Sequence, residues 1–500
     1  MWRSSKTVTF KRFFLFLLLV ILPVLGFHSC QPEIARSTIV IFHVNDVHGA
    51  IDNFAKIGWL LEEERKQNPN VFFMSAGDNF TGNCYVDNSE PTKGTPILTL
   101  FNRLGLDAQV LGNHDFDYGQ QALRSYIEGA AFPVICANAV VAGAMIPQPG
   151  PYTTLATEGG VRIAVVGAVQ TGWYSGIPST HPSNVEGIVF SDGIESMLAY
   201  KSLRNNYDVL IGLTHLGFTT DEKLAGQMGE LDVIIGGHSH TRVDTQVVEN
   251  GVLIAQAGDD GGYVGRIDLV VEDGVVVEKR SSLVNAANIQ GELSDIKAMI
   301  DGYQDNQAMN QPLTTLSPPL EGKDELGCLI TDGVRSTLAL DIVFQNNGGI
   351  RVWQLPQDSG NQVSVCDVYE MLPFGNEVVA LIMTPQEIRA LIADSFTRAN
   401  GIDLQVSGIE YTVNYSEDTA SSIKINSIDI VTPDGDPLDE SKTYWVGMNS
   451  YMYATYEFDH QDPGQSTHKT MADMLVGYMG QGIDAQNYKG IKRARAKLAN

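Results

Sequence analysis

Short apolar runs that end in polar, glycine-marked loops recur along the first half of the chain. Five segments share this pattern, and their loops carry His, Asp or Asn; they are residues 38–49, 70–82, 107–119, 207–217 and 231–241. Segments with the apolar spacing of amphipathic helices lie between them, at residues 54–67, 96–105, 119–130 and 193–206. Alternating buried strands and helices predict a layered α/β architecture for this half.

A second pattern begins near residue 290. Residues 292–313 have the polar outer face of a surface helix, so we expect them to connect two domains. Beyond them helix-like and strand-like segments mix, and three stretches alternate apolar and polar residues as half-buried strands do: 403–415, 421–432 and 443–453. The basic tail at residues 489–500 is interpreted as a solvated helix end.

The length of the chain supports a division into domains, because 500 residues exceed what one hydrophobic core usually organises. We predict an N-terminal domain at residues 38–290, a helical linker at 291–323 and a mixed α/β domain at 324–500. The predicted fold class is therefore α/β in the broad sense that includes α+β. A hydrophobic content of 43% and a charged content of 18% are typical of a globular protein.

The formal net charge of the chain is −26 at pH 7. An acidic surface repels the phosphate backbone of nucleic acids, so we expect no nucleic-acid polymer as a partner. Small anions stay possible as ligands where a bound metal ion provides local positive charge.

The first 30 residues have the layout of an export signal. Basic residues precede an apolar run at residues 13–27, which Pro23 interrupts and which is short for a bilayer span. The run leads to Ser29-Cys30, which resembles a bacterial lipoprotein cleavage site with Cys30 as the lipidated residue. We expect an exported protein, in the periplasm or at the outer membrane or cell surface. A plain signal peptide or an uncleaved anchor is the alternative.

Four further cysteines are spread over the rest of the chain: Cys84, Cys136, Cys328 and Cys366. Export permits disulfides, but four widely spaced thiols do not make a disulfide framework, and no CxxC pair is present. We interpret them as core or loop cysteines and leave open whether Cys328 and Cys366 pair.

The polar residues that follow the five apolar runs are candidates for catalysis. The carboxyl ends of parallel strands meet at one edge of a sheet, so we expect these side chains to converge there. Alternation along an extended chain would put Asp46 and His48 on one side, and likewise His238 and His240. The complete set is Asp46, His48, Asp78, Asn113, His114, Asp115, Asp117, His215, His238 and His240. No site role is assigned to His43, His181, His460 or His468.

This set exceeds the ligands of one tetrahedral zinc and suits two metal centres, with Asp78 as the expected bridge. Two metals about 3.5–4 Å apart can clamp both the attacking and the leaving oxygen of a phosphoryl transfer. Phosphate monoester hydrolysis requires accelerations of up to ~10²¹, of which a positioned His supplies only about 10²–10⁴. Metals must therefore provide much of the remainder, with a His114–Asp117 pair as a supplement.

Five motifs in order carry a family resemblance: DVHG (46–49), GDNF (77–80), GNHDFDYG (112–119), THLG (214–217) and GHSH (237–240). They resemble those of the calcineurin-like metallophosphoesterases. NNGGIR (346–351) and LPFGN (372–376) resemble the C-terminal substrate domain of the bacterial 5′-nucleotidase/UDP-sugar hydrolase branch. The resemblance covers roughly residues 38–470. It implies a four-layer N-terminal β-sandwich flanked by helices, a helical linker and an α/β substrate-binding domain.

The resemblance also implies roles for individual residues. One divalent ion is assigned to Asp46, His48, Asp78 and His240, and the other to Asp78, Asn113, His215 and His238. His114 resembles the catalytic histidine, oriented by Asp117, and Asp115 resembles a structural acid. The two ions are expected from the class of Mn, Zn, Fe, Co or Mg.

In the second domain the resemblance places Asn346, Arg351 and Phe374 against the nucleotide, with Phe374 stacked on the base. The family usually has a second aromatic residue followed by a Gly-Gly-Asp-Gly turn, and this turn is missing here. Tyr451 can stand for the aromatic residue, and Glu457 or Asp459 for the aspartate. The metal chemistry therefore follows more directly from the sequence than the nucleotide specificity does.

The predicted function is removal of phosphate from nucleoside 5′-monophosphates or related nucleotides, by in-line attack of metal-bound water or hydroxide. Alternatives of the same fold are a 2′,3′-cyclic-nucleotide phosphodiesterase, a UDP-sugar hydrolase and a sulfur-ester hydrolase. A lipid-anchored binding protein without catalysis is a further alternative, which the His114–Asp117 pair makes less attractive. The expected partner is a small nucleotide, and the oligomeric state is left open.

Overall fold

The computed structural model describes residues 36–172, 175–357, 360–417 and 423–499, and Arg36–Asn500 form one compact unit. The expected signal segment, with Cys30, lies outside the described residues. Within the described ranges no helix is both long enough and apolar enough to cross a bilayer.

A six-stranded sheet contains the first three of the five apolar runs. Its strand order is β14-β13-β1-β2-β3-β4, where β1 to β4 are parallel and β13 is antiparallel to both β1 and β14. Its members are β1 (Arg36–Val44), β2 (Val71–Ser75), β3 (Ala108–Val110), β4 (Val134–Ile135), β13 (Tyr263–Glu272) and β14 (Val275–Asn285). The predicted strands at 38–49, 70–82 and 107–119 are thus confirmed, each followed by its polar loop.

A second six-stranded sheet contains the other two runs. Its order is β11-β12-β10-β9-β7-β6, with parallel strands at the centre and an antiparallel strand at each edge. Its members are β6 (Tyr152–Ala156), β7 (Arg162–Val169), β9 (Val209–His215), β10 (Val233–Ile235), β11 (Val247–Glu249) and β12 (Val252–Ala255). A short ladder of β5 (Ala139–Val141) and β8 (Ile188–Phe190) lies apart from both sheets.

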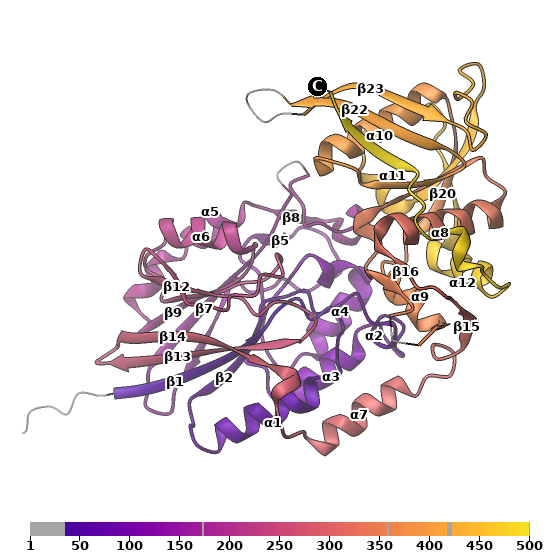
Figure 1. Ribbon diagram of the computed structural model, residues 1–500. Helices are drawn as coiled ribbons and strands as arrows, with labels where there is room; N and C mark the ends of the chain where they lie inside the picture. Colours follow the sequence, from indigo (N-terminus) through magenta and orange to yellow (C-terminus); the bar gives the residue numbers. More distant parts are fainter. Residues whose placement is uncertain (1–35, 173–174, 358–359, 418–422, 500) are drawn as a thin grey trace, which may run out of the picture. The chain divides into compact units, whose positions relative to one another are not determined.

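The two sheets pack face to face, and helices cover their outer faces. Ile41 and Met74 of the first sheet share one buried cluster with Val165 and Ile211 of the second. Figure 1 shows the layers in order, from α5 and α6 through both sheets to α1, α3 and α7. The bounds are α1 (Phe54–Arg65), α3 (Thr95–Leu104), α4 (Gly119–Gly129), α5 (Gly193–Leu198), α6 (Phe218–Gln227) and α7 (Ser294–Gln304). This arrangement confirms the predicted four-layer sandwich.

The expected connecting helix is shorter than its predicted range. Helix α7 ends at Gln304, and only Ile296 and Ile300, four positions apart, are buried on it. Beyond it the Asn306 side chain accepts a hydrogen bond from the Ala308 N–H (3.2 Å), a local turn that competes with helix. The chain then becomes β15 (Pro312–Thr315), which pairs with β19 (Gln362–Ser364).

The C-terminal half is built on a mixed five-stranded sheet of order β21-β17-β24-β20-β25. Helices bury one face of this sheet, and a further helix together with a second, three-stranded sheet buries the other. The strands of the five-stranded sheet are β17 (Ile342–Asn346), β20 (Glu377–Met383), β21 (Leu404–Ser407), β24 (Tyr444–Asn449) and β25 (Gln465–Thr470). The three-stranded sheet consists of β22 (Glu410–Glu417), β23 (Ile423–Val431) and β26 (Ala494–Leu498). A separate pair is formed by β16 (Leu320–Glu321) and β18 (Gln354–Leu355). The helices are α8 (Gly322–Leu338), α9 (Val365–Met371), α10 (Pro385–Ala399), α11 (Ser450–Thr455) and α12 (Met471–Met479).

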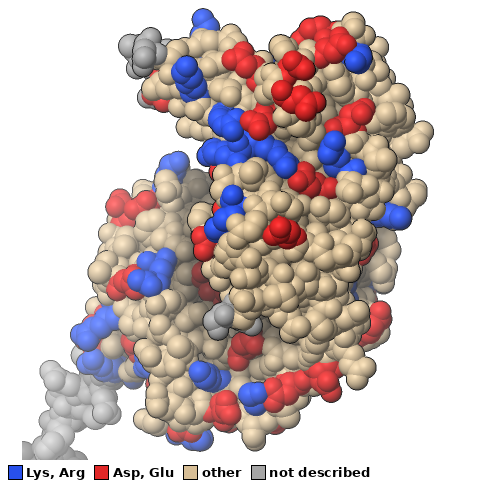
Figure 2. Space-filling view, turned by 45° about the vertical axis from the view of Figure 1, so that its right-hand side comes forward, with Lys and Arg blue, Asp and Glu red and all other residues tan. Residues whose placement is uncertain are grey.

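The basic tail is a strand, so its interpretation as a helix end is wrong. Strand β26 runs parallel to β22, with Ala494 opposite Tyr411. Alternating Ala494, Arg495 and Ala496 have the period of two that a strand requires. Most basic side chains of the tail are paired with acidic ones: Lys489, Lys492, Arg493 and Arg495 form ion pairs, with Arg493 2.7 Å from Asp332. On the face shown in Figure 2, likewise, acidic and basic side chains are intermixed.

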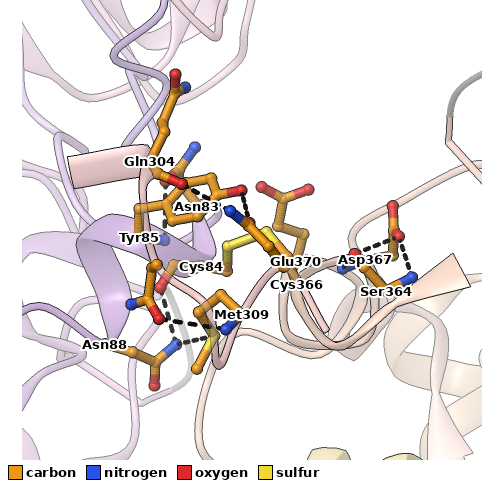
Figure 3. The surroundings of a disulfide bond; sticks show 12 residues. Asn83, Cys84, Tyr85, Asn88, Gln304, Met309, Ser364, Cys366, Asp367 and Glu370 are labelled. Carbon is orange, nitrogen blue, oxygen red and sulfur yellow. Dashed lines mark hydrogen bonds between the residues drawn. A yellow bond between two sulfur atoms is a disulfide. The ribbon is translucent and has the colours of Figure 1, made fainter. Parts of the chain in front are cut away.

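One disulfide joins the two halves of the chain. Cys84 lies in α2 (Cys84–Asp87) and bonds to Cys366 in α9, 282 positions away (Figure 3). The interpretation of all four cysteines as unpaired core or loop residues is therefore wrong for this pair. Cys136 and Cys328 are free and buried, as expected for core cysteines, and the pairing of Cys328 with Cys366 that was left open does not occur.

Candidate metal centre and active site

The candidate ligands follow the strand ends, but in a backbone conformation that the sequence pattern did not predict. Asp46, His48, Asp78, His238 and His240 all have positive φ angles, between 49° and 77°. Non-glycine residues adopt this left-handed conformation at a cost, and it is concentrated at functional sites. The expected alternation along an extended segment is therefore the wrong reason for the pairing of Asp46 with His48, although the two side chains do converge.

Asp46, His48 and His240 form the first group, with ligand atoms within 4.8 Å of one another. His48 Nδ1 lies 3.0 Å from the Thr81 carbonyl oxygen, and His240 Nδ1 lies 3.0 Å from Asp259 Oδ2. Both oxygens can only accept, so each Nδ1 carries the ring proton. The two Nε2 atoms, 3.2 Å apart, then face each other with lone pairs. This is the arrangement in which ring nitrogens bind a cation.

Asp78, His215 and His238 form the second group, again within 4.8 Å. His215 Nδ1 donates to the Ala76 carbonyl oxygen at 2.7 Å, so Nε2 is the ring atom that can bind either a proton or a cation. That buried Nε2 lies 3.0 Å from Asp78 Oδ2 yet has no partner in hydrogen-bond geometry. Asn113 joins this group through its Oδ1, 2.9 Å from His238 Nδ1.

The two groups are neighbours, because Asp46 Oδ1 lies 3.9 Å from His215 Nε2. Burial opposes a charge on His215, but the Asp78 carboxylate raises the pKa of His215 to about 10. Burial and the nearby His215 lower the pKa of His238 to about 4, which keeps that ring neutral and able to ligate. The site is built for positive charge, and its donor set fits two divalent cations.

Asp115 belongs to neither ligand group and organises the ligand loops through their backbone. Its carboxylate accepts hydrogen bonds from the backbone N–H groups of Asp78 (3.2 Å), Asn79 (2.9 Å) and Gly112 (2.8 Å). These bonds tie the loop after β2 to the loop after β3, which supports the expectation that Asp115 is a structural acid.

A third cluster of potential ligands does not form a metal site. Cys84, Cys366 and Glu370 approach one another, but the two cysteines are bonded to each other and offer no thiolate.

His114 and Asp117 form a hydrogen-bonded pair beside the second group. His114 Nδ1 lies 2.7 Å from Asp117 Oδ2, so Nδ1 carries a proton and Nε2 is left for a ligand. Burial disfavours the charged ring, but Asp117 and Asp78 raise the pKa of His114. The imidazolium is thereby stabilised and can act as a proton donor.

A pocket of about 280 Å³ opens beside these residues. From the first half it is lined by Asp78, Asn113, His114, Asp117, His238 and His240, and from the second half by Asn346, Arg351, Phe374 and Tyr451. The Phe374 ring stacks on the His114 ring, and the Arg351 guanidinium lies 5.7 Å from the centre of the Phe374 ring. Asn346 Oδ1 accepts from Asn449 Nδ2 at 2.8 Å, which fixes its orientation. Glu457 and Asp459 are not among the residues that line this pocket.

Two family models match the chain. Residues 39–242 match the model described as calcineurin-like phosphoesterase, and residues 308–458 match the model of the 5′-nucleotidase C-terminal domain. The chain belongs to the calcineurin-like phosphoesterases that carry a 5′-nucleotidase C-terminal domain. This family uses two divalent metal ions, in agreement with the two ligand groups of this phosphoesterase.

Known proteins resemble the phosphoesterase over most of its length. It is 26% identical to the trifunctional nucleotide phosphoesterase protein YfkN of Bacillus subtilis, over 83% of this chain and 32% of YfkN, so it spans about a third of that relative. It is also 26% identical to a 5′-nucleotidase of Diplobatis ommata, over 83% of this chain and 82% of the relative. The solved 5′-nucleotidase precursor from Thermus thermophilus has a TM-score of 0.75 at 24% identity, covering 92% of this chain and 99% of that one. This likeness confirms the fold.

The sequence patterns missed several residues of the phosphoesterase site. Ser179, Thr180, His181 and Asn184 line the pocket, although the sequence patterns assign no site role to His181. Asp259 fixes the His240 ring. Their segments carry no motif, and a Thr or Ser in a loop is too common to be a signal by itself. His43 is buried in β1, as expected, and His460 and His468 do not line the pocket.

Proposed function

We propose that this phosphoesterase hydrolyses nucleoside 5′-monophosphates or related nucleotides. One observation carries the proposal: a single pocket brings together members of both ligand groups, the His114–Asp117 pair, and Arg351, Phe374 and Tyr451 of the second half. The first set suits a phosphoryl group, and the second suits an anionic ligand with an aromatic base.

Asp46, His48, Asp78 and His240 would hold one cation, and Asp78, Asn113, His215 and His238 the other, with Asp78 as the bridge. When bound, the two ions would supply Lewis-acid charge and lower the pKa of water at the phosphorus. The second-half residues bind and orient the ester.

Proton transfer falls to His114 in this proposal. Its Nδ1 proton is held by Asp117, so its Nε2 can donate a hydrogen bond or a proton to a phosphoryl or leaving oxygen. Phe374 covers one face of the ring and shields it from water. Arg351 adds a fixed positive charge that can pair with the phosphate.

The test is hydrolysis of AMP by the purified protein with Mn²⁺, with and without chelator. We expect phosphate release that stops on chelation and resumes when Mn²⁺ is restored. His114→Ala should lower kcat by about 10²–10⁴, the usual contribution of general acid–base catalysis. A protein that is loaded with metal but does not release phosphate from AMP would overturn the proposal.

A second candidate, hydrolysis of a nucleotide diphosphate ester such as UDP-glucose, is favoured by a second cavity. This cavity, of about 740 Å³, shares His240 and Arg351 with the first pocket and also contains His48. Lys323, Asp52 and Gln357 line it and suit a phosphate and sugar hydroxyl groups. Comparing kcat/KM for AMP, UDP-glucose and a 2′,3′-cyclic nucleotide decides between the candidates, since a strong preference for UDP-glucose would require this second cavity.

We also propose that residues 38–290 act as the metal domain and 324–500 as the substrate domain, joined by residues 291–323. Each half contributes its own set of residues to the pocket, which supports this division. For residues 1–30 the proposal is export, with lipidation at Cys30 and a place in the periplasm or at the cell surface. Mass spectrometry of the mature N-terminus tests it, because a diacylglyceryl-modified Cys30 is expected and an unmodified first residue elsewhere would contradict it.

A further inference from the structure

The carboxylate of Asp117 is held from both sides. Its Oδ2 accepts from His114 Nδ1 at 2.7 Å, and its Oδ1 accepts from the hydroxyl of Thr180 at 2.7 Å. Thr180 is 3% exposed, so water does not compete freely for this bond. Among the described residues, the Thr180 hydroxyl is thus the one hydrogen-bond donor to Asp117 Oδ1.

The direction of the Thr180 hydroxyl is also determined. Asn184 Nδ2 donates to Thr180 Oγ1 at 3.2 Å and also contacts the backbone oxygen of Asp117 at 3.4 Å. Because an amide nitrogen can only donate, Thr180 Oγ1 accepts this bond and turns its own proton toward Asp117. The chain of donors therefore runs from Asn184 through Thr180 and ends at the Asp117 carboxylate, which also accepts from His114.

The neighbouring residue acts on the metal side of the same loop. The Ser179 carbonyl oxygen accepts from Asn113 Nδ2 at 3.2 Å. This bond settles the orientation of the Asn113 amide, whose Oδ1 then faces His238. Two successive residues of one segment thus orient Asn113 and Asp117, which flank His114 in the chain.

We propose that Thr180 is a positioning residue for the reaction, which holds Asp117 so that His114 presents Nε2 to the substrate. This inference rests on the proposed function of the site. A carboxylate without the Thr180 bond can rotate about its terminal torsion, which is broad and roughly two-fold, and the His114 ring then loses its fixed plane. Residues that orient a catalytic group in this way change rates by about 10–100-fold when they are removed.

Thr180→Val is the test variant, because it replaces the hydroxyl by a methyl group of similar size. We expect kcat for AMP to fall about 10–100-fold while KM stays within about two-fold, and Thr180→Ser, which keeps the hydroxyl, to recover most of the loss. Thr331→Val is the matched control, since Thr331 is also buried and, among the described residues, its hydroxyl bonds only within α8, to Gly327 and Cys328. It should leave kcat unchanged. Metal content and thermal midpoint are measured for every variant.

A double-mutant cycle separates positioning from a general structural effect. In a His114→Ala background Thr180→Val should cost no further activity, because the group that Thr180 positions is absent. An equal loss in both backgrounds, or a kcat within two-fold of wild type, would overturn the inference. The cycle is run on both AMP and p-nitrophenyl phosphate. If wild type cleaves p-nitrophenyl phosphate but not AMP, nucleotide hydrolysis is refuted. The role of Thr180 is then still tested with p-nitrophenyl phosphate.

Discussion

The imidazole of His114 and the ring of Phe374 stack on each other, with centroids 5.5 Å apart and planes inclined by 29°. His114 follows β3 in the first half of the chain, and Phe374 precedes β20 in the second half. The residue proposed to move protons is therefore covered by the residue proposed to bind the base. A change at Phe374 can act in two ways, and substrates with and without a base distinguish them.

Phe374→Leu is predicted to weaken nucleotide binding. A base stacked on an aromatic ring contributes about 1–3 kcal/mol, so KM for AMP should rise roughly 5- to 150-fold. Ribose 5-phosphate, which lacks the base, should show a much smaller change in KM. Steady-state kinetics with both substrates measures the difference.

The conservative variant Phe374→Tyr is the control and should stay near wild type. If Phe374→Leu lowers kcat equally for both substrates and leaves both KM values unchanged, Phe374 acts only through His114. That outcome would contradict its assignment to the base.

Reduction of the Cys84–Cys366 bond is predicted to destabilise the protein. The bond closes a long loop between α2 and α9, and such crosslinks contribute about 2–4 kcal/mol, mainly by restricting the unfolded chain. Tyr85 contacts Asn310, and Asn88 contacts Met309 (Figure 3), so part of the contact should survive reduction. Urea unfolding with and without dithiothreitol measures the effect.

The double variant Cys84→Ser/Cys366→Ser is the control for that experiment. It should unfold at lower urea than wild type and should not respond to dithiothreitol, since Cys136 and Cys328 are already free. Equal midpoints for oxidised and reduced wild type would show that this bond does not stabilise the fold.

Glu370, next to the disulfide, is predicted to make stability depend on pH. Burial, reinforced by Asp367, raises the pKa of Glu370 to about 7 from 4.5, although Gln357 Nε2 donates to it at 2.6 Å. A raised pKa in an acid means that the folded state is favoured while the group is protonated. This contribution is full below about pH 4.5 and is lost as pH rises through about 7.

The measurement compares wild type with Glu370→Gln, which cannot ionise, in chelator so that metal loading does not vary. From pH 4.5 to 7.5 the free energy of unfolding of wild type should fall relative to the variant by roughly 1–3 kcal/mol. Glu128→Gln, at the exposed end of α4, is the matched control for removing a carboxylate from the surface. A difference for Glu370→Gln that is flat or rises with pH would contradict the prediction.

The metal ligands could be predicted from the sequence because each belongs to a short local motif. Asp46, Asp78 and His215 each follow a strongly apolar run, and the edge of a parallel sheet gathers such positions. The left-handed backbone at Asp46 and His48 could not be predicted, since neither residue is a glycine. The predicted convergence of the ligand side chains is therefore confirmed, but an extended backbone is the wrong reason for it.

Contacts between distant segments were beyond the sequence patterns. Thr180 meets Asp117 from 63 positions away, and nothing in its loop distinguishes it from other polar loops. Four cysteines allow three ways of forming two disulfides, so the Cys84–Cys366 bond depends on how α2 and α9 dock. The tail is a different case: the alternation over 494–498 indicates a strand, whereas its basic composition is equally typical of a solvated helix end.

The most direct test of the account is the number of divalent ions that the protein binds, measured by metal analysis after Mn²⁺ loading and desalting. Wild type should hold about two ions per chain, and His48→Ala and His215→Ala, one in each ligand group, about one each. Both variants should lose AMP hydrolysis by at least about 10²-fold. One ion per wild-type chain, or AMP hydrolysis that survives in the metal-depleted protein, would contradict the account.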